Sequence, residues 1–267
     1  MRAERTTAAP RAARQLTDEQ RAQRAIGVVG VSIAVTILLY VIPYGRWIGY
    51  PLVLISTVVH EMGHGVAGWL VGGRFEAFRM YADGSGVAEI SGYDGRFARA
   101  FVSAGGLCGP AVMAAIGLVL ARRPRGARIA LLVAGLALAV IDVLLVRSLF
   151  GWFFLLALAA VALSVAWKAP EWGSQLTLSF LSVQLALSVF SRGDYLFTDV
   201  AHTQNGAMPS DVANMASALF LPYWFWGAAC GAFSVSMLAL GAWLFLRGLR
   251  TPSAAGAKHE HGLASRG

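Results

Sequence analysis

Charged residues are scarce in this chain of 267 residues: 13% are Asp, Glu, Lys or Arg, whereas 57% are hydrophobic. A soluble domain of ordinary composition carries about 25% charged residues, so the composition excludes a typical soluble globular protein. The apolar residues are grouped in long runs, and a helix needs about 20 such residues to cross the core of a bilayer. We therefore expect an integral, multi-pass membrane protein.

Cysteine is rare as well. The two cysteines, Cys108 and Cys230, lie far apart in apolar segments and form no Cys-x-x-Cys pair. Isolated cysteines without that spacing are typical of small buried hydrophobic side chains. A cleavable signal peptide is not evident, because the first thirty residues are rich in arginine and lack an apolar stretch that ends in a cleavage site. We expect the first apolar run to be a retained anchor.

The apolar runs predict an all-α polytopic membrane protein with six or seven transmembrane helices. A flexible basic arm (residues 1–23) precedes the membrane-embedded region (24–250), and a flexible tail (251–267) follows it. The candidate spans are residues 24–42, 51–72, 97–121, 128–146, 149–167, 174–190 and 219–246.

The formal net charge of +8 comes from the chain ends and from loops. Arginines gather in the amino-terminal arm, in residues 122–128 and after the last apolar run. Such clusters flank membrane helices and favour the cytoplasmic side. We interpret them as headgroup contacts and topology signals, so the lipid bilayer is an expected partner and nucleic acid is not.

The most informative segment is His60-Glu61-Met62-Gly63-His64, which lies inside the apolar run 51–72. Residues i and i+4 share one face of a helix, so His60 and His64 can bind one metal ion. Glu61 beside them can take a proton from a water that the metal activates. Ionisable groups are costly at membrane depth and are functional by default. The motif predicts a Zn²⁺ site in the membrane, and a purely structural polar cluster is the alternative.

Small residues surround this motif. Gly63, Gly65 and Gly68 thin one side of the predicted helix and let another backbone come close, as a peptide substrate would require. The small residues of 104–110 favour packing of the third apolar run against the metal-site helix. Pro110 in that run frees a backbone carbonyl.

Residues 73–92 contain a pattern typical of a β-hairpin. Phe75 and Phe78 are strand-type residues, and Asp83-Gly84 is a strong turn signal. Backbone groups at membrane depth must be paired, covered or placed at the interface. We expect a small hairpin or sheet between the second and third helices, whose open edge can bind an extended peptide. An ordinary structured loop is the alternative.

Two histidines do not complete a catalytic zinc site, which usually has three protein ligands. Most candidates for the third ligand lie in residues 191–221, a long polar stretch between two late apolar runs. Asp211 follows Ser210 at the start of a predicted helix, so it also fits a helix N-cap. The candidates are Asp142, Asp194, Asp199, His202 and Asp211, with Glu76 and Glu89 nearer to the motif.

These features together resemble a known family. A transmembrane HExxH motif, followed by a strand-rich loop and a helix with a Gly-Pro step, resembles the site-2 protease family of intramembrane zinc metallopeptidases. Residues 210–226, which begin Ser-Asp-Val-Ala-Asn-Met-Ala and end Pro-Tyr-Trp-Phe-Trp, are similar to a pattern of its small bacterial B-like branch. The chain lacks the Asn-Pro … Leu-Asp-Gly motif of the larger family and has no PDZ-like insertion.

The resemblance implies a role for each site residue. His60 and His64 would be zinc ligands, Glu61 the general base, and Asp211 the third ligand in preference to Asp194. Residues 24–250 would then form a metallopeptidase domain in a bacterial cell membrane. Its substrates would be membrane-anchored proteins whose helix can unwind locally, and a further membrane protein would be a possible regulator.

Two other functions fit the same residues. One is a membrane zinc peptidase whose third ligand is a glutamate, for which Glu89 or Glu171 would have to serve. The other is a non-catalytic membrane adaptor that retains a metal site. The intact Glu61 favours an enzyme, because metal retention alone does not require that base.

Overall fold

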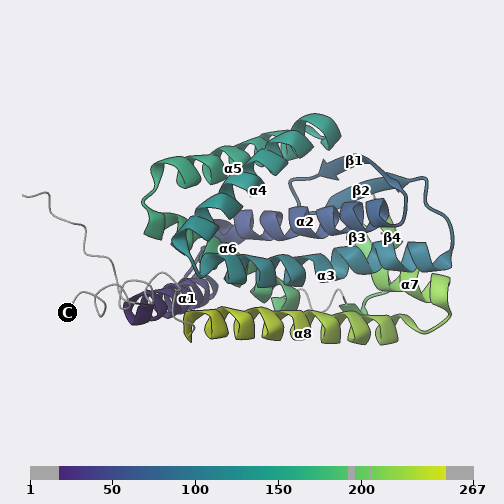
Figure 1. The fold of residues 1–267 in the computed structure, drawn as a ribbon. Coiled ribbons are helices and arrows are strands. Elements are labelled where there is room, and N and C mark those ends of the chain that lie inside the picture. The colour runs from purple at the N-terminus through teal and green to yellow at the C-terminus, as the bar shows by residue number, and fades with distance from the viewer. Residues whose placement is uncertain (1–17, 192–195, 205, 251–267) are drawn as a thin grey trace, which may run out of the picture.

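The computed structural model of the chain describes residues 18–191, 196–204 and 206–250, so most of the predicted arm and the tail 251–267 lie outside the described residues. The described residues form helices and two separate two-stranded antiparallel sheets (Figure 1). The helices are α1 (Asp18–Val41), α2 (Gly45–Leu70), α3 (Arg96–Ala121), α4 (Pro124–Leu145), α5 (Leu149–Lys168), α6 (Glu171–Ser191), α7 (Asp211–Leu219) and α8 (Tyr223–Arg250). The strands are β1 (Arg74–Met80), β2 (Gly86–Ser91), β3 (Val200–Thr203) and β4 (Gly206–Pro209). Helix α1 begins at Asp18, so residues 18–23 of the predicted arm are helical.

The prediction of a helical, multi-pass membrane protein is confirmed. In the described part of the chain, the 5 helices α3, α4, α5, α6 and α8 are long and apolar enough to cross a bilayer, which agrees roughly with the predicted six or seven spans. The apolar part of α1 is shorter, Ala25–Leu39. Helix α2 is long enough, but His60, Glu61 and His64 lower its hydropathy.

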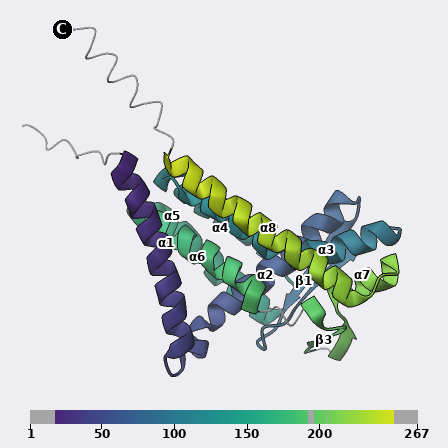
Figure 2. The ribbon, with the colours of Figure 1, turned by 90° about the horizontal axis from the view of Figure 1, so that it is seen from below.

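The last span begins later than predicted. Residues 219–246 were expected to form one helix, but α7 ends at Leu219 and α8 begins at Tyr223. Phe220 adopts a left-handed conformation (φ 66°), and Pro222 cannot continue a helix because it lacks a backbone N–H. This break separates the short helix α7 from the membrane span α8, which lies alongside α3 (Figure 2).

The predicted hairpin between the second and third helices is confirmed. Strands β1 and β2 pair antiparallel, and the turn between them contains Gly84 at φ 89°. Phe78 and Met80 of β1 are fully buried and pack against Leu54 and Val58 of α2. The hairpin is thereby fixed to the helix that carries the HExxH motif.

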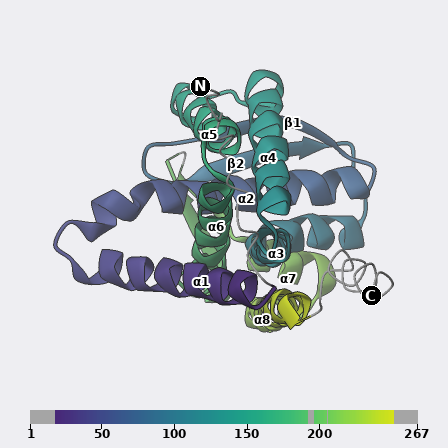
Figure 3. The same cartoon turned by 60° about the vertical axis from the view of Figure 1, so that its left-hand side comes forward.

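Helices α4 and α5 lie side by side (Figure 3). The connection between them pairs with the outer edge of β1 and closes it. The backbone N–H of Arg147 donates to the carbonyl of Phe78 (2.8 Å), and the N–H of Met80 donates to the hydroxyl of Ser148 (2.9 Å). Among the described residues, the outer edge of β2 has no such backbone partner and is open.

Helices α2 and α3 cross where both carry glycine. A Cβ atom on Gly63 would overlap the carbonyl oxygen of Gly105, and one on Gly105 would lie 2.6 Å from the carbonyl oxygen of Gly63. Such close backbone approach requires small residues. The run 104–110 therefore packs against the helix that carries the HExxH motif, as the sequence predicts.

Gly65 and Gly68 of α2 contact the hairpin. A Cβ on Gly65 would overlap the ring of Phe75, and one on Gly68 would lie 2.6 Å from the Cγ2 atom of Ile90. The space that these glycines leave is thus filled by side chains of β1 and β2. This corrects the expectation that the thinned side of α2 receives a substrate.

Candidate metal centre

His60 and His64 lie on one face of α2. Their Nε2 atoms are 3.2 Å apart, and their rings meet edge to face with centroids 4.8 Å apart. This follows from helical geometry, because residues four positions apart are stacked one turn above the other.

Asp211, the first residue of α7, completes the group. Its Oδ2 atom lies 3.1 Å from Nε2 of His60 and 3.4 Å from Nε2 of His64. The three side chains are 14%, 12% and 11% exposed for His60, His64 and Asp211, so water competes little for their polar atoms. Three potential metal-ligand atoms from two distant segments therefore converge in one partly enclosed place.

The residues fit a tetrahedral cation. Zinc binds histidine nitrogen and carboxylate oxygen at about 2.0–2.1 Å, which places two tetrahedral ligands about 3.3 Å apart. The three separations of 3.1–3.4 Å agree with that value. Oδ2 of Asp211 is also buried without a hydrogen bond of suitable geometry. A buried carboxylate oxygen without a partner is costly, and a bound cation would satisfy it.

Helix α3 orients the ring of His64. Nδ1 of His64 lies 2.8 Å from the backbone carbonyl of Val102, which can only accept, so Nδ1 carries the proton. The lone pair of Nε2 is then directed to the side where His60 and Asp211 lie. Gly106 packs against the same ring, where a Cβ would overlap Nε2 of His64.

Asp211 is not the N-cap of α7. The cap is Ser210, whose hydroxyl accepts from the backbone N–H of Ala213 at 3.2 Å. The backbone N–H of Ser210 in turn donates to the carbonyl of Asp199 at 3.0 Å, which ties the start of the helix to the base of the β3–β4 hairpin. The carboxylate of Asp211 is thereby left for another role.

Glu61 is 6% exposed and lies against strand β2. A Cβ on Gly86 would lie 2.9 Å from Cγ and 3.2 Å from Oε1 of Glu61, so glycine at this position makes room for the glutamate. Among the described residues no group hydrogen-bonds to its carboxylate, which lines a cavity together with His60.

A family model described as Peptidase M50B-like matches residues 31–241. This range contains the HExxH motif, both hairpins and Asp211. The chain belongs to the M50B-like peptidase family. The resemblance to the site-2 protease family is thus confirmed. No curated protein and no solved structure matches the chain significantly.

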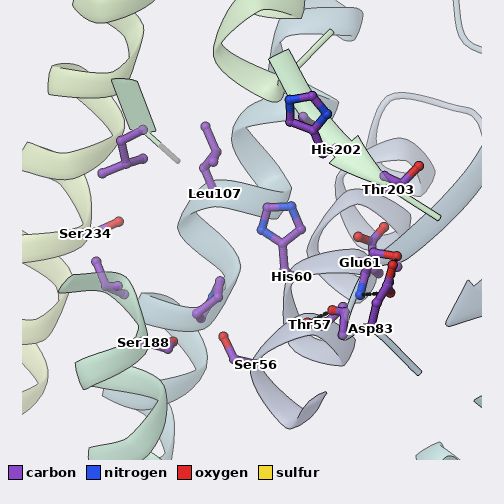
Figure 4. A pocket seen from close by; sticks show the side chains of 17 residues that line it. Ser56, Thr57, His60, Glu61, Asp83, Leu107, Ser188, His202, Thr203 and Ser234 are labelled. Carbon is purple, nitrogen blue, oxygen red and sulfur yellow. Dashed lines mark hydrogen bonds between the residues drawn. The ribbon is translucent and has the colours of Figure 1, made fainter. Parts of the chain in front are cut away.

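The M50B-like site opens onto a cavity of about 370 Å³. Helices α2, α3, α6 and α8 line it, together with the β1–β2 turn and strand β3. Figure 4 shows His60 and Glu61 in this cavity, with His202 of β3 across from His60. Part of the polar stretch 191–221 lines this cavity, through Leu196, Ala201, His202 and Thr203.

Other candidate ligands of the M50B-like site have different partners or lie elsewhere. Glu89 pairs with Arg79, and Glu76 accepts a hydrogen bond from Ser91. His202 reaches the cavity but is not part of the three-residue group.

The remaining acidic candidates are also outside that group. Asp142 is buried in α4, where its Oδ1 atom has no partner among the described residues. The nearby Arg147 donates to the carbonyls of Leu144 and Val146. Asp199 is exposed at the base of a hairpin. Asp194 lies outside the described residues.

The β3–β4 hairpin is the functional element that the sequence analysis missed. Its strands pair from Val200 with Pro209 to Thr203 with Gly206. The dipeptide Asn205-Gly206 is the local signal that indicates such a hairpin. The hairpin matters because it precedes Asp211 directly and forms one wall of the cavity.

Proposed function

We propose that the chain is an intramembrane zinc metallopeptidase that hydrolyses peptide bonds of membrane-anchored proteins. The observation that carries this proposal is the convergence of His60, His64 and Asp211 within 3.1–3.4 Å, with Glu61 in the adjoining cavity. These three residues would hold the zinc ion, which when bound supplies a Lewis acid and makes water acidic enough to react near neutral pH.

Glu61 is the general base of the proposed reaction. It takes a proton from the attacking water and later gives it to the leaving amine. Three features support this role: its place next to His60 in the motif, its burial, and a carboxylate without a competing partner among the described residues. A non-catalytic adaptor would not need a base at this position.

The open edge of β2 supports binding of an extended substrate segment. In an antiparallel sheet, pairs of opposite residues alternate between those that exchange hydrogen bonds and those that do not. The N–H of Tyr81 donates to the carbonyl of Ser85, so the next pair, Met80–Gly86, exchanges no hydrogen bonds, and neither does Phe78–Ala88. The backbone groups of Gly86 and Ala88 therefore point away from β1. A segment added to this edge would pass Glu61, because Gly86 lies against that side chain.

Substitutions of Glu61 and Asp211 test the proposal on the full chain purified in detergent. Glu61→Gln should retain one zinc per chain and abolish cleavage of a membrane-anchored reporter. Asp211→Ala should lose both zinc and cleavage. Asp199→Asn is the matched control, since it changes an exposed acid on the same polar segment and should behave as wild type.

Two results would contradict the proposal. Normal turnover by Glu61→Gln would reject the general base, and a fully metallated Asp211→Ala would reject this residue as a ligand. Loss of zinc from Glu89→Gln would favour the peptidase with a glutamate ligand, although the pairing of Glu89 with Arg79 does not support that arrangement.

A further inference from the structure

His202 occupies the wall of the cavity that faces the HExxH helix (Figure 4). It lies on β3, where it pairs with Ala207 of β4, and its side chain is among those that line the cavity with His60 and Glu61. It is too far from the three-residue group to be a metal ligand in this arrangement.

Most other polar side chains of the cavity are already hydrogen-bonded. The hydroxyl of Thr57 donates to the carbonyl of Gly84 (2.8 Å), that of Ser85 to Asp83 (2.7 Å), and that of Thr203 to Gly206 (3.1 Å). The hydroxyl of Ser188 donates to the carbonyl of Leu185 at 2.7 Å. These groups are therefore occupied within the protein.

His202 differs from them. No group among the described residues hydrogen-bonds to its ring, and the residue is exposed toward the cavity. An imidazole carries at least one N–H donor in either protonation state, whereas a carboxylate only accepts. Ser56 also lines the cavity, but it is 3% exposed within α2. His202 is thus the accessible donor of this wall.

The strand that carries His202 is held from two sides. The hydrogen bond from the N–H of Ser210 to the carbonyl of Asp199 ties the hairpin to the first turn of α7, which bears Asp211. At its other end, the N–H of Gln204 donates to the hydroxyl of Ser85 at 3.5 Å. The turn that contains Ser85 is attached to α2 through Thr57. The position of His202 is therefore fixed relative to both the three-residue group and Glu61.

We propose that His202 is a further catalytic residue, which donates a hydrogen bond to the carbonyl oxygen of the scissile peptide bond. This inference rests on the proposed function. When the water oxygen bonds to the carbonyl carbon, its proton passes to Glu61 and the electron pair of the C=O double bond moves onto the carbonyl oxygen. The N–H of His202 stabilises that negative charge. As the double bond re-forms, the C–N bond breaks and Glu61 returns the proton to the amine.

His202 neither gains nor loses a proton in this sequence, so its contribution depends on the donor and not on titration. Positioned donors aimed at developing negative charge act strongly in an enclosed site, where removal of one costs about 10²–10³-fold in kcat. Polar groups of the cavity such as the hydroxyls of Thr57 and Ser85 are held in place by hydrogen bonds before substrate binds.

The test compares His202→Leu, which lacks a donor, with His202→Gln, which retains an N–H of similar reach. On a membrane-anchored reporter, His202→Leu should lower kcat about 100-fold with little change in KM. His202→Gln should recover at least tenfold of that loss, and zinc content should stay at one per chain in both. Met208→Leu on the paired strand β4, which does not line the cavity, is the control and should match wild type.

The opposing outcomes are distinct. Loss of zinc from His202→Leu, an increase in KM alone, or equal rates for the Leu and Gln variants would each overturn the role of His202. Glu61→Gln is measured in parallel. If it is inactive while His202→Leu is fully active, the inference about His202 fails and the proposed function stands. If Glu61→Gln is active, the proposed function itself fails.

Discussion

Nδ1 of His64 lies 2.8 Å from the backbone carbonyl of Val102, so a residue of the HExxH helix is oriented by the neighbouring helix α3. The contact leaves Nε2 of His64 free to bind a metal. Helix α3 also packs Gly106 against this ring, where a Cβ atom would overlap it, and Gly105 lets the two helices approach closely. Close packing of α2 and α3 therefore shapes the candidate metal centre.

Gly106→Ala should weaken zinc binding, because the added Cβ would overlap Nε2 and Cε1 of His64. Disturbing groups that orient a ligand typically costs about 10–100-fold in metal affinity, and we expect a loss in that range. Competition with a chelator measures it. Gly49→Ala, where a Cβ meets nothing within 4 Å, is the control on α2 and should keep wild-type affinity. Unchanged affinity in Gly106→Ala would show that the ring tolerates displacement.

Gly63→Ala should destabilise the crossing of α2 and α3 by about 1–3 kcal/mol, as overpacking of a tight contact does. The new Cβ would meet the backbone of Gly105, which cannot rotate away. Thermal unfolding in detergent measures the change. Gly68→Ala should cost less, because its Cβ would meet the side chain of Ile90, which can adopt another rotamer. Equal stability of the two variants would argue against a rigid backbone contact.

Glu89→Gln should leave zinc content unchanged and cleavage within about twofold of wild type. The carboxylate of Glu89 pairs with Arg79 on the partly exposed hairpin, and such pairs contribute about 0–1 kcal/mol to stability. Metal analysis and the reporter assay measure both quantities. A drop in zinc content would instead make Glu89 a ligand.

Ala88→Pro should reduce cleavage of a substrate that adds a strand to β2. The N–H of Ala88 points to the open edge and is not used within the hairpin, so proline removes a donor to the substrate while sparing the β1–β2 pairing. Ala88→Val retains the N–H and is the control. We expect a higher KM for Ala88→Pro with zinc content unchanged. Identical kinetics for the two variants would exclude strand addition at this edge.

Short local patterns predicted a large part of the molecule. Residues 60–64 placed two imidazoles on one helical face because four residues complete about one turn. Asp83-Gly84 indicated the first hairpin because glycine adopts the positive φ that its turn requires. The grouping of Asp211 with His60 and His64 came from a resemblance, since nothing local in the sequence relates residues so far apart.

Other features depend on contacts that no local pattern reports. The glycines of α2 were correctly expected to allow close approach, but only the fold shows that α3, Phe75 and Ile90 occupy the space. The β3–β4 hairpin has strands of 4 residues each, too short for a clear alternation of apolar and polar residues. By length and hydropathy alone 5 helices qualify as spans, because the polar motif lowers the hydropathy of α2 and the apolar part of α1 is short.

The three-residue group is assembled from segments that are synthesised at different times. Synthesis proceeds from the amino terminus, so His60 emerges long before Asp211, which lies on α7. A nascent chain that ends before α7 has two imidazoles but no carboxylate to complete the group. The proposed hydrolytic activity would therefore require that both α2 and α7 have been synthesised and have packed together.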